Sequence, residues 1–160
     1  MLRVQQVMTQ NVHCCDRDDS LERAAQLMWE HDIGAVVVVD GAGRPIAMLT
    51  DRDISMAAYI QGKPLAKIRV GEAMSKALVT VQTANSVSDV EQVMREHQVR
   101  RVPVVNAGGE LAGIVSQNDL VREAARERET SNKEISAVEV TATLAAISQP
   151  RFGRLAAPVA

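Results

Sequence analysis

The chain has 160 residues, of which 46% are hydrophobic and 24% charged, and its formal net charge is -2. This composition is typical of an ordinary globular protein, long enough for one compact domain or two half-domains sharing a core. The lack of net positive charge and the near absence of aromatic residues argue against a dedicated nucleic-acid binder, which relies on basic surfaces and often on stacking.

The sequence also narrows the cellular location. No apolar run approaches the roughly 18 residues that span a bilayer, and the first residues lack the apolar core of a signal peptide, so we expect a cytoplasmic protein without a membrane partner.

Cys14 and Cys15 are adjacent, and no Cys/His pattern nearby indicates a metal site. We interpret them as structural thiols on opposite faces of a strand; a redox enzyme built on them is the least favoured hypothesis.

Segments 8–54 and 74–120 repeat one pattern at a constant offset of 66 residues without a gap. Identical pairs include Met8 with Met74 and Asp53 with Asp119. A repeat of this length indicates a duplicated structural unit, and two such units are expected to pack face to face across a pseudo-twofold axis.

Each repeat is predicted to contain a strand, a helix, a hairpin and a second helix. Polar capping residues, Ser20 and Ser86, precede the first helices, which carry apolar residues at helical spacing, and the hairpin strands are rich in valine. Trp29, near the end of the first helix, is interpreted as an edge or interface residue. The predicted elements are 12–15, a helix from 21, 35–39, 46–49 and 51–59 in the first repeat, and 79–81, a helix from 87, 102–105, 111–115 and 117–125 in the second.

Residues 60–69 are predicted to be a linker between the repeats. After Arg128 the chain becomes polar, and Ser131 with Glu134 forms a capping-box pattern that predicts a helix over about residues 132–147. Its apolar stripe is expected to comprise Ile135, Val138, Leu144 and Ile147. We therefore expect three parts: a first repeat (1–62), a second repeat (63–128), and a C-terminal helix with a frayed tail (129–160).

The end of each second hairpin strand carries the residues of greatest chemical interest. Thr50 or Ser116 is followed three residues later by Asp53 or Asp119, in the first turn of a helix. A helix N-terminus suits phosphate, a hydroxyl can donate to the same phosphate, and an ionised aspartate suits a sugar diol. Gly113, or Ala47 in the first repeat, would let a flat ring approach the strand. These parts fit a nucleotide, but the same pair is also an ordinary helix cap, and both interpretations stay open.

The repeated pattern resembles a tandem pair of CBS (cystathionine-β-synthase) domains over about residues 4–125. Its most recognisable stretches are Val102-Pro103-Val104-Val105-Asn106 and Gly113-Ile114-Val115-Ser116. The resemblance implies an α+β (α/β) fold of two βαββα units packed by pseudo-twofold symmetry, which often dimerise further. Members of the family bind AMP, ADP, ATP, S-adenosylmethionine, or sometimes NADH or magnesium, in two clefts between the repeats, and usually regulate an attached or partner protein.

By this resemblance, the chain is expected to be a regulatory module and not an enzyme. It would need no cofactor, bind an adenosine nucleotide, form a homodimer and act on an unidentified protein; nucleic acid is not an expected partner. The alternatives are a module for S-adenosylmethionine, or an interaction protein with vestigial clefts whose C-terminal helix docks on another chain.

The resemblance also implies two sites, named here after their aspartates. In the Asp119 site, Asp119 would hold ribose, Ser116 phosphate and Ile114 adenine. Its full set is Asp119, Ser116, Ile114, Asn118, Arg100 and Arg101, faced by Thr9, Val12, His13 and Ile33. The Asp53 site would use Asp53, Thr50, Met48 and Arg52, faced by Ser75, Leu78, Val79 and Val99.

The two sites are not expected to be equivalent. Gly34 and Ala35 occupy the places of Arg100 and Arg101 in the first repeat, where Arg52 is the remaining cation. We therefore expect the Asp119 site to bind phosphorylated nucleotide more tightly. The Asp53 site is expected to bind weakly, to prefer a less charged ligand such as S-adenosylmethionine, or to stay empty.

Overall fold

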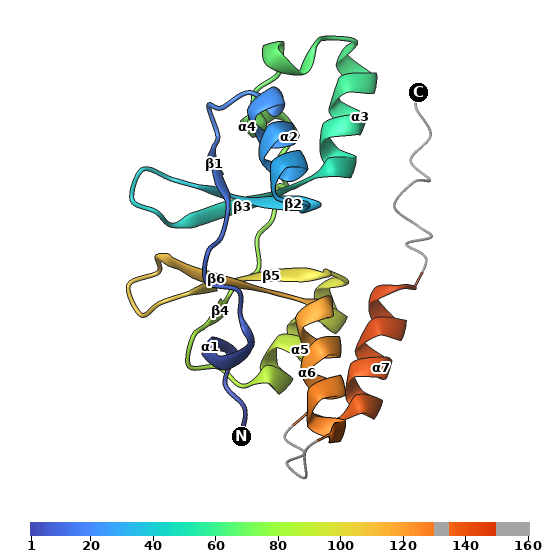
Figure 1. Ribbon diagram of the computed structural model, residues 1–160. Helices are drawn as coiled ribbons and strands as arrows, with labels where there is room; N and C mark the ends of the chain where they lie inside the picture. The colour runs from blue at the N-terminus through green and yellow to red at the C-terminus, as the bar shows by residue number, and fades with distance from the viewer. Residues whose placement is uncertain (130–134, 150–160) are drawn as a thin grey trace.

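The computed structural model describes residues 1–129 and 135–149, and each repeat is built around a three-stranded sheet (Figure 1). The first repeat contains β1 (Cys14–Asp16), α2 (Leu21–Glu30), β2 (Ala35–Val39), β3 (Pro45–Thr50) and α3 (Asp51–Gln61). The second contains β4 (Val81–Gln82), α5 (Val87–His97), β5 (Arg101–Val105), β6 (Leu111–Ser116) and α6 (Gln117–Glu129). The predicted fold of two βαββα units is confirmed. The first strand of each repeat is displaced towards the C-terminus, so that Val12 and Val79 lie outside β1 and β4.

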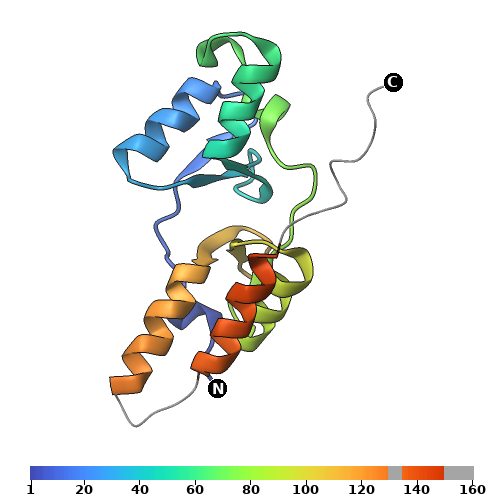
Figure 2. The same ribbon diagram turned by 90° about the vertical axis from the view of Figure 1, so that its right-hand side faces the viewer.

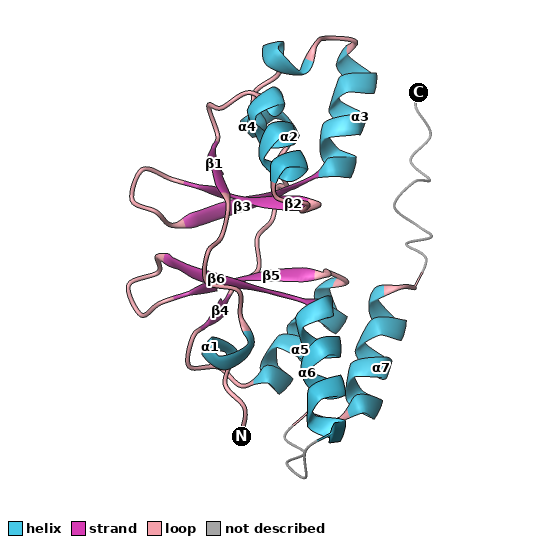
Figure 3. Cartoon of the chain, in the orientation of Figure 1, coloured by secondary structure: helices cyan, strands magenta, loops and turns pink. Residues whose placement is uncertain are grey.

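The two sheets have the same topology and face each other, with the helices on their outer sides (Figure 3). In each sheet the first strand pairs parallel with the second, and the second pairs antiparallel with the third. Val36 and Val38 of β2 belong to the core beneath the helices, so Val37, which is also fully buried, points to the opposite face. The valine-rich strand is therefore covered on both faces, as its composition predicts.

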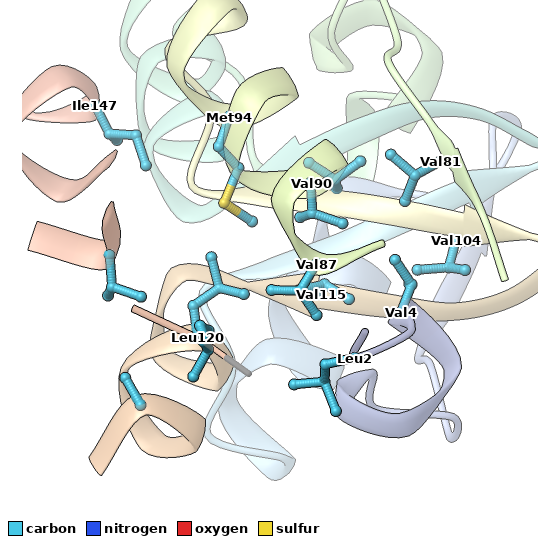
Figure 4. Packing of buried hydrophobic residues seen from close by; sticks show 14 residues of the cluster. Leu2, Val4, Val81, Val87, Val90, Met94, Val104, Val115, Leu120 and Ile147 are labelled. Atoms are coloured by element: carbon cyan, nitrogen blue, oxygen red, sulfur yellow. The ribbon is translucent and has the colours of Figure 1, made fainter. Parts of the chain in front are cut away.

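The hydrophobic cores do not follow the chain order of the repeats. Leu2 and Val4, which precede β1, are buried in the core of the second repeat together with Val104 and Val115 (Figure 4). Conversely, the segment after α3 joins the first core. It contains a 3₁₀ turn, η1 (Leu65–Lys67), and α4 (Val70–Ala73); Ile68 is fully buried there. Residues 60–69 thus contribute to the first core, which the prediction of a linker did not anticipate.

Equivalent main-chain hydrogen bonds hold the two segments in these cores. The N–H of Leu21, the first residue of α2, donates to the carbonyl of Ile68 at 2.9 Å, and the N–H of Val87, the first residue of α5, donates to Leu2 at 3.1 Å. The short helices α1 (Val4–Val7) and α4 follow these segments. The domain boundaries predicted after residues 62 and 128 stay a prediction.

The C-terminal helix, α7 (Ala137–Ile147), begins later than predicted. Its N-cap is Ser136, whose hydroxyl accepts from the N–H of Glu139, while the expected capping residues Ser131 and Glu134 lie outside the described residues. Val138, predicted to be buried, is 78% exposed, because the helix turns Val140, Thr143 and Ile147 inward instead. Figure 2 shows α7 lying along α5 and α6, and it packs against both. This helix, which the alternative hypothesis docks on another chain, therefore packs on two helices of its own chain.

A buried carboxylate lies beneath α7. Glu91 of α5 is 2% exposed, and among the described residues its Oε1 has no hydrogen-bond partner. Burial, the largest cause, and the charge of Glu139 on α7 together raise the pKa of Glu91 to about 7, against the lowering effect of Arg95. Arg95 itself donates to the buried hydroxyl of Thr143 at 2.8 Å. The contact between α5 and α7 thus combines a polar anchor with an acid that is costly to ionise.

Candidate functional site

Each predicted site lies where the segment after a short helix meets the last strand of a sheet. The segment after α1 meets β6, and the segment after α4 meets β3. The N–H of Thr9 donates to the carbonyl of Ile114, and the N–H of Ile114 donates back to Thr9, both at 2.9 Å. In the first repeat, Ser75 donates from its N–H to Met48 at 2.8 Å, and its hydroxyl accepts from the N–H of Met48 at 3.0 Å. The structure therefore brings Thr9 to Ile114 and Ser75 to Met48, and leaves the Ile114 side chain, but not its backbone, for a ligand.

The carboxylate of Asp119 lies at the start of α6 and is only 7% exposed. Its Oδ2 accepts from the N–H and the hydroxyl of Ser116, at 2.7 and 2.6 Å. Its Oδ1 accepts from the guanidinium of Arg122, one helical turn further on. In this state both carboxylate oxygens accept hydrogen bonds, and Arg122 would compete with a sugar diol for Oδ1.

Asp53 makes the same cap but keeps one oxygen available. Its Oδ2 accepts from the N–H and the hydroxyl of Thr50, at 2.9 and 2.7 Å. Among the described residues, nothing donates to its Oδ1. The residue that corresponds to Arg122 is Met56, which cannot form an ion pair. The sequence prediction compared the arginines before the strands and missed this difference, although the spacing of three on a helix places Arg122 beside Asp119.

The two helix N-termini also differ. The first N–H of α3 donates to Gly34 and the second to the carboxylate of Asp51, whereas the first N–H of α6 donates to Arg100. The Asn118 N–H is used by no hydrogen bond in the described part of the chain. The second repeat thus has a neutral Gln117 where the first has the anionic Asp51, and it keeps one N–H open, which favours an anion there.

The predicted phosphate-binding arginines lie at the start of β5. Arg100 is exposed, while Arg101 is half-buried and points its guanidinium towards the first repeat. A Cβ built on Gly34 would lie 3.5 Å from both Arg101 Nη2 and Asp51 Oδ2. The absence of a side chain at Gly34 therefore leaves room for the guanidinium of Arg101 where the two repeats meet, close to Asp51.

Gly113 has a different role from the one predicted. A Cβ at this position would lie 2.6 Å from the sulfur of Met8 and 2.9 Å from the carbonyl oxygen of Thr9. Gly113 is buried, so the space is filled by the chain itself and is not left for a ligand ring. The glycine is required because the segment that carries Thr9 crosses the strand at close range.

The remaining predicted wall residues are half-buried, and the contacts seen for three of them are with the hydrophobic cores or with another side chain. Ile33 packs against the first core and Val99 against the second. The ring of His13 stacks on His31 with centroids 3.6 Å apart. For Val12, Leu78 and Val79, membership of a site stays a prediction, as it does for Arg52, which is exposed on α3.

The described residues indicate neither a metal site nor a reactive thiol. Within the described part of the chain, no three His, Cys, Asp or Glu side chains gather in a way that could hold a metal ion. Burial raises the pKa of Cys14, and burial with the charge of Asp19 raises that of Cys15 to about 11, which disfavours the reactive thiolate. None of the helices in residues 1–129 and 135–149 is long and apolar enough to cross a membrane.

Comparison with known proteins identifies the repeated unit. The family model of the CBS domain matches residues 4–59 and 70–126. The chain is 38% identical over 120 residues to the CBS domain-containing protein YhcV of Bacillus subtilis, covering 75% of this chain and 84% of that protein. It spans only 31% of a longer relative from Methanocaldococcus jannaschii, to which it is 35% identical over 135 residues.

Two solved structures are similar in sequence and in fold. The structure of Hypoxic Response Protein I, solved with two coordinated zinc ions, matches with a TM-score of 0.68 and 36% identity over 77% of this chain and 99% of that one. A protein named Hypoxic response protein 1, from Mycobacterium tuberculosis, is also a sequence relative of this chain. CBSX2, solved in complex with AMP, matches with a TM-score of 0.68 and 25% identity over 80% of this chain and 99% of that one.

Proposed function

We propose that this protein, which belongs to the CBS domain family as a tandem pair of repeats, is a regulatory module that senses an adenosine nucleotide. AMP, ADP or ATP would bind between the repeats at the Asp119 site, and its occupancy would pass to the protein's own oligomer or to a regulated partner. The module would act through its ligand's different affinity for two arrangements of the repeats, and would catalyse no reaction.

One observation carries this proposal: the buried carboxylate of Asp119, the open N–H of Asn118 and the strand position Ile114 lie in one stretch, held against Thr9 of the other chain segment. Ribose would meet Asp119, phosphate the helix N-terminus with Arg100 or Arg101, and adenine the side chain of Ile114. The AMP complex of CBSX2 supports an adenosine ligand for this fold.

The charges support an order of affinity between the sites. Asp51 places an anion at the N-terminus of α3, which disfavours phosphate in the Asp53 site, whereas Gln117 is neutral. Within the described part of the chain, the Oδ1 of Asp53 accepts no hydrogen bond and so stays available to a sugar. The Asp53 site therefore suits a less negative adenosine compound, such as S-adenosylmethionine, and the Asp119 site a nucleotide.

Replacing Asp119 by asparagine is expected to weaken AMP binding at least tenfold, because a hydrogen bond to a charged group contributes about 1.5–3 kcal/mol. Asn can still accept from the N–H of Ser116, so the helix cap is largely kept. Isothermal titration calorimetry of the wild type, Asp119→Asn and the matched Asp53→Asn measures the effect. Failure of the wild type to bind AMP, ADP, ATP and S-adenosylmethionine at millimolar concentration would contradict the function, and a larger loss in Asp53→Asn would reverse the order of the sites.

Replacing Arg122 by methionine, the residue at the same position of the first repeat, is expected to strengthen binding of adenosine about two- to fivefold. This is the factor that corresponds to an exposed ion pair of ~0.5–1 kcal/mol, which the ligand no longer has to break. Adenosine is the proper probe because it carries no phosphate for Arg122 to attract. Arg126→Met is the control, since Arg126 is similarly exposed and pairs with Glu123 instead. Equal affinities for all three proteins would show that Arg122 does not compete.

A further inference from the structure

The contact between α5 and α7 contains four polar side chains, which we call the α5/α7 cluster (Figure 2). They are Glu91 and Arg95 of α5, and Glu139 and Thr143 of α7. Glu91 and Thr143 are buried, whereas Glu139 is exposed. Among the described residues the Oε1 of Glu91 accepts no hydrogen bond, and a carboxyl buried in this way is costly to ionise. The cluster thus places an acid without full hydrogen bonding beneath the last helix.

The first repeat shows that the fold does not require this acid. At the offset of 66 residues, Ala25 of α2 takes the place of Glu91 and packs against the first core. Trp29, which is 89% exposed, takes the place of Arg95. In the described part of the first repeat, α3 is followed by η1 and α4, and no helix corresponds to α7. The acid and its neighbouring cation therefore occur in the repeat that carries α7, which links them to the attachment of that helix.

Arg95 can stabilise either α7 or an ionised Glu91. Its Nη1 donates to the hydroxyl of Thr143 at 2.8 Å, which anchors α7 on α5. Arg95 also lies four residues after Glu91 on the same helix, the spacing and order at which an acid and a cation form a favourable pair. A neutral Glu91 leaves Arg95 to Thr143, whereas an ionised Glu91 attracts the guanidinium away from α7.

The charge on α7 acts in the same direction. Burial is the main cause that raises the pKa of Glu91, and the charge of Glu139 adds to it, so an ionised Glu91 is repelled by α7. Of the other described elements that pack here, β5 contributes buried valines to the core, and Glu123 of α6 is paired with Arg126. The charges that act on Glu91 thus oppose its ionisation while α7 is in place, apart from that of Arg95.

We infer that α7 is attached reversibly: it stays packed on α5 and α6 while Glu91 is protonated, and it separates from them when Glu91 ionises. In the closed state Arg95 donates to Thr143 and the carboxyl keeps its proton. In the open state Arg95 pairs with the carboxylate, water reaches Glu91, and the repulsion by Glu139 is relieved. Opening is therefore favoured as the pH rises. This inference goes beyond nucleotide sensing and does not depend on whether the Asp119 site binds a ligand.

Hydrogen exchange of the full chain at pH 5 and pH 8, corrected for the intrinsic effect of pH on exchange, tests this inference. In the wild type, exchange of residues 137–147 is expected to rise by roughly tenfold or more at pH 8, because the pKa of Glu91 is about 7 in the closed state and near 4.5 in the open one. Glu91→Gln cannot ionise and should show equal corrected rates at both pH values. Equal rates in the wild type, or an undiminished rise in Glu91→Gln, overturn the inference.

The strand β5 (Arg101–Val105) distinguishes opening of α7 from unfolding of the whole repeat. Residues 137–147 should exchange faster than β5 at both pH values, because α7 separates while the sheet stays folded. Equal rates for the two segments would mean that α7 opens only with the whole core, which also overturns the inference. Glu96→Gln, which removes an exposed carboxylate from the same helix, should behave as the wild type does.

Thr143→Val tests the competition for Arg95. Without the hydroxyl, Arg95 can pair with Glu91 while α7 is still in place, so ionisation of Glu91 no longer removes an anchor. Corrected exchange of residues 137–147 should then be faster than in the wild type at pH 5 and should depend less on pH. A faster exchange by the same factor at pH 5 and pH 8 would show that Arg95 does not change partners, and would overturn the mechanism of release.

Discussion

Replacing Glu91 by glutamine is expected to stabilise the protein by roughly 2–3 kcal/mol at pH 8 and by much less at pH 5. Burial raises the pKa of this carboxyl to about 7 in the folded state, above the value of about 4.5 that applies when the chain unfolds. Between these values the folded chain binds more protons than the unfolded one, so stability falls as the pH rises. The contribution of Glu91 is complete below about pH 4.5 and is lost as the pH passes through 7.

Urea denaturation of the wild type and of Glu91→Gln at a series of pH values measures this effect as a difference between the two proteins, so that other titrating groups cancel. Glu96→Gln serves as the control for removing a carboxylate from the exposed side of the same helix. A constant difference between wild type and Glu91→Gln across pH 5–8 would show that the carboxyl does not ionise at a cost. If the loss at pH 8 is confined to α7, hydrogen exchange in residues 137–147 will rise before global unfolding.

Replacing Gly113 by alanine is expected to lower the free energy of unfolding by about 1–3 kcal/mol, which is the usual cost of forcing extra atoms into a filled space. The added methyl would overlap the sulfur of Met8 and the carbonyl of Thr9, at 2.6 and 2.9 Å. Main chain cannot yield as a flexible side chain does, so the hydrogen bonds between Thr9 and Ile114 are expected to loosen. AMP affinity should fall together with stability, because that pairing aligns the proposed site.

Gly41→Ala is the matched control for this experiment. It makes the same chemical change in the hairpin between β2 and β3, where nothing lies within 4 Å of the new Cβ, and its effect should stay within about 0.5 kcal/mol. Urea denaturation gives both values. Equal stability of Gly113→Ala and Gly41→Ala would mean that the Thr9 segment can move away from β6 at no cost.

Most of the fold was predictable because duplication supplies each pattern twice. Valine-rich runs, capping serines and turn residues recur at the same offset, and the elements they predict lie within a few residues of those in the structure. The sequence could not show which core a short apolar segment joins. Leu2 and Val4 have no periodicity that distinguishes a tail from a core element, and only the tertiary contacts assign them to the second repeat.

The helix caps of the candidate site were predictable from the sequence, whereas the other contacts of their aspartates were not. The pairs Thr50 with Asp53 and Ser116 with Asp119 form the caps that the spacing indicates. Comparing the repeats at equivalent positions identified the arginines of β5, yet the cation that meets Asp119 is Arg122, on the helix itself. The role of Gly113 was also hidden, because a glycine required by a close backbone approach has the same sequence signal as one that admits a ligand.

The assignment of Leu2 and Val4 to the second core has a consequence for the order of folding. The first core is formed by one continuous stretch of chain, from Cys15 to Val70, with Met74 packed against it. The second combines the N-terminal residues with others from Val81 to Ile147, so it can close only after most of the chain has been synthesised. A folded first repeat already holds its two ends near each other, which shortens the effective loop that the second core has to close. The N-terminal repeat would then act as the folding template of the C-terminal one.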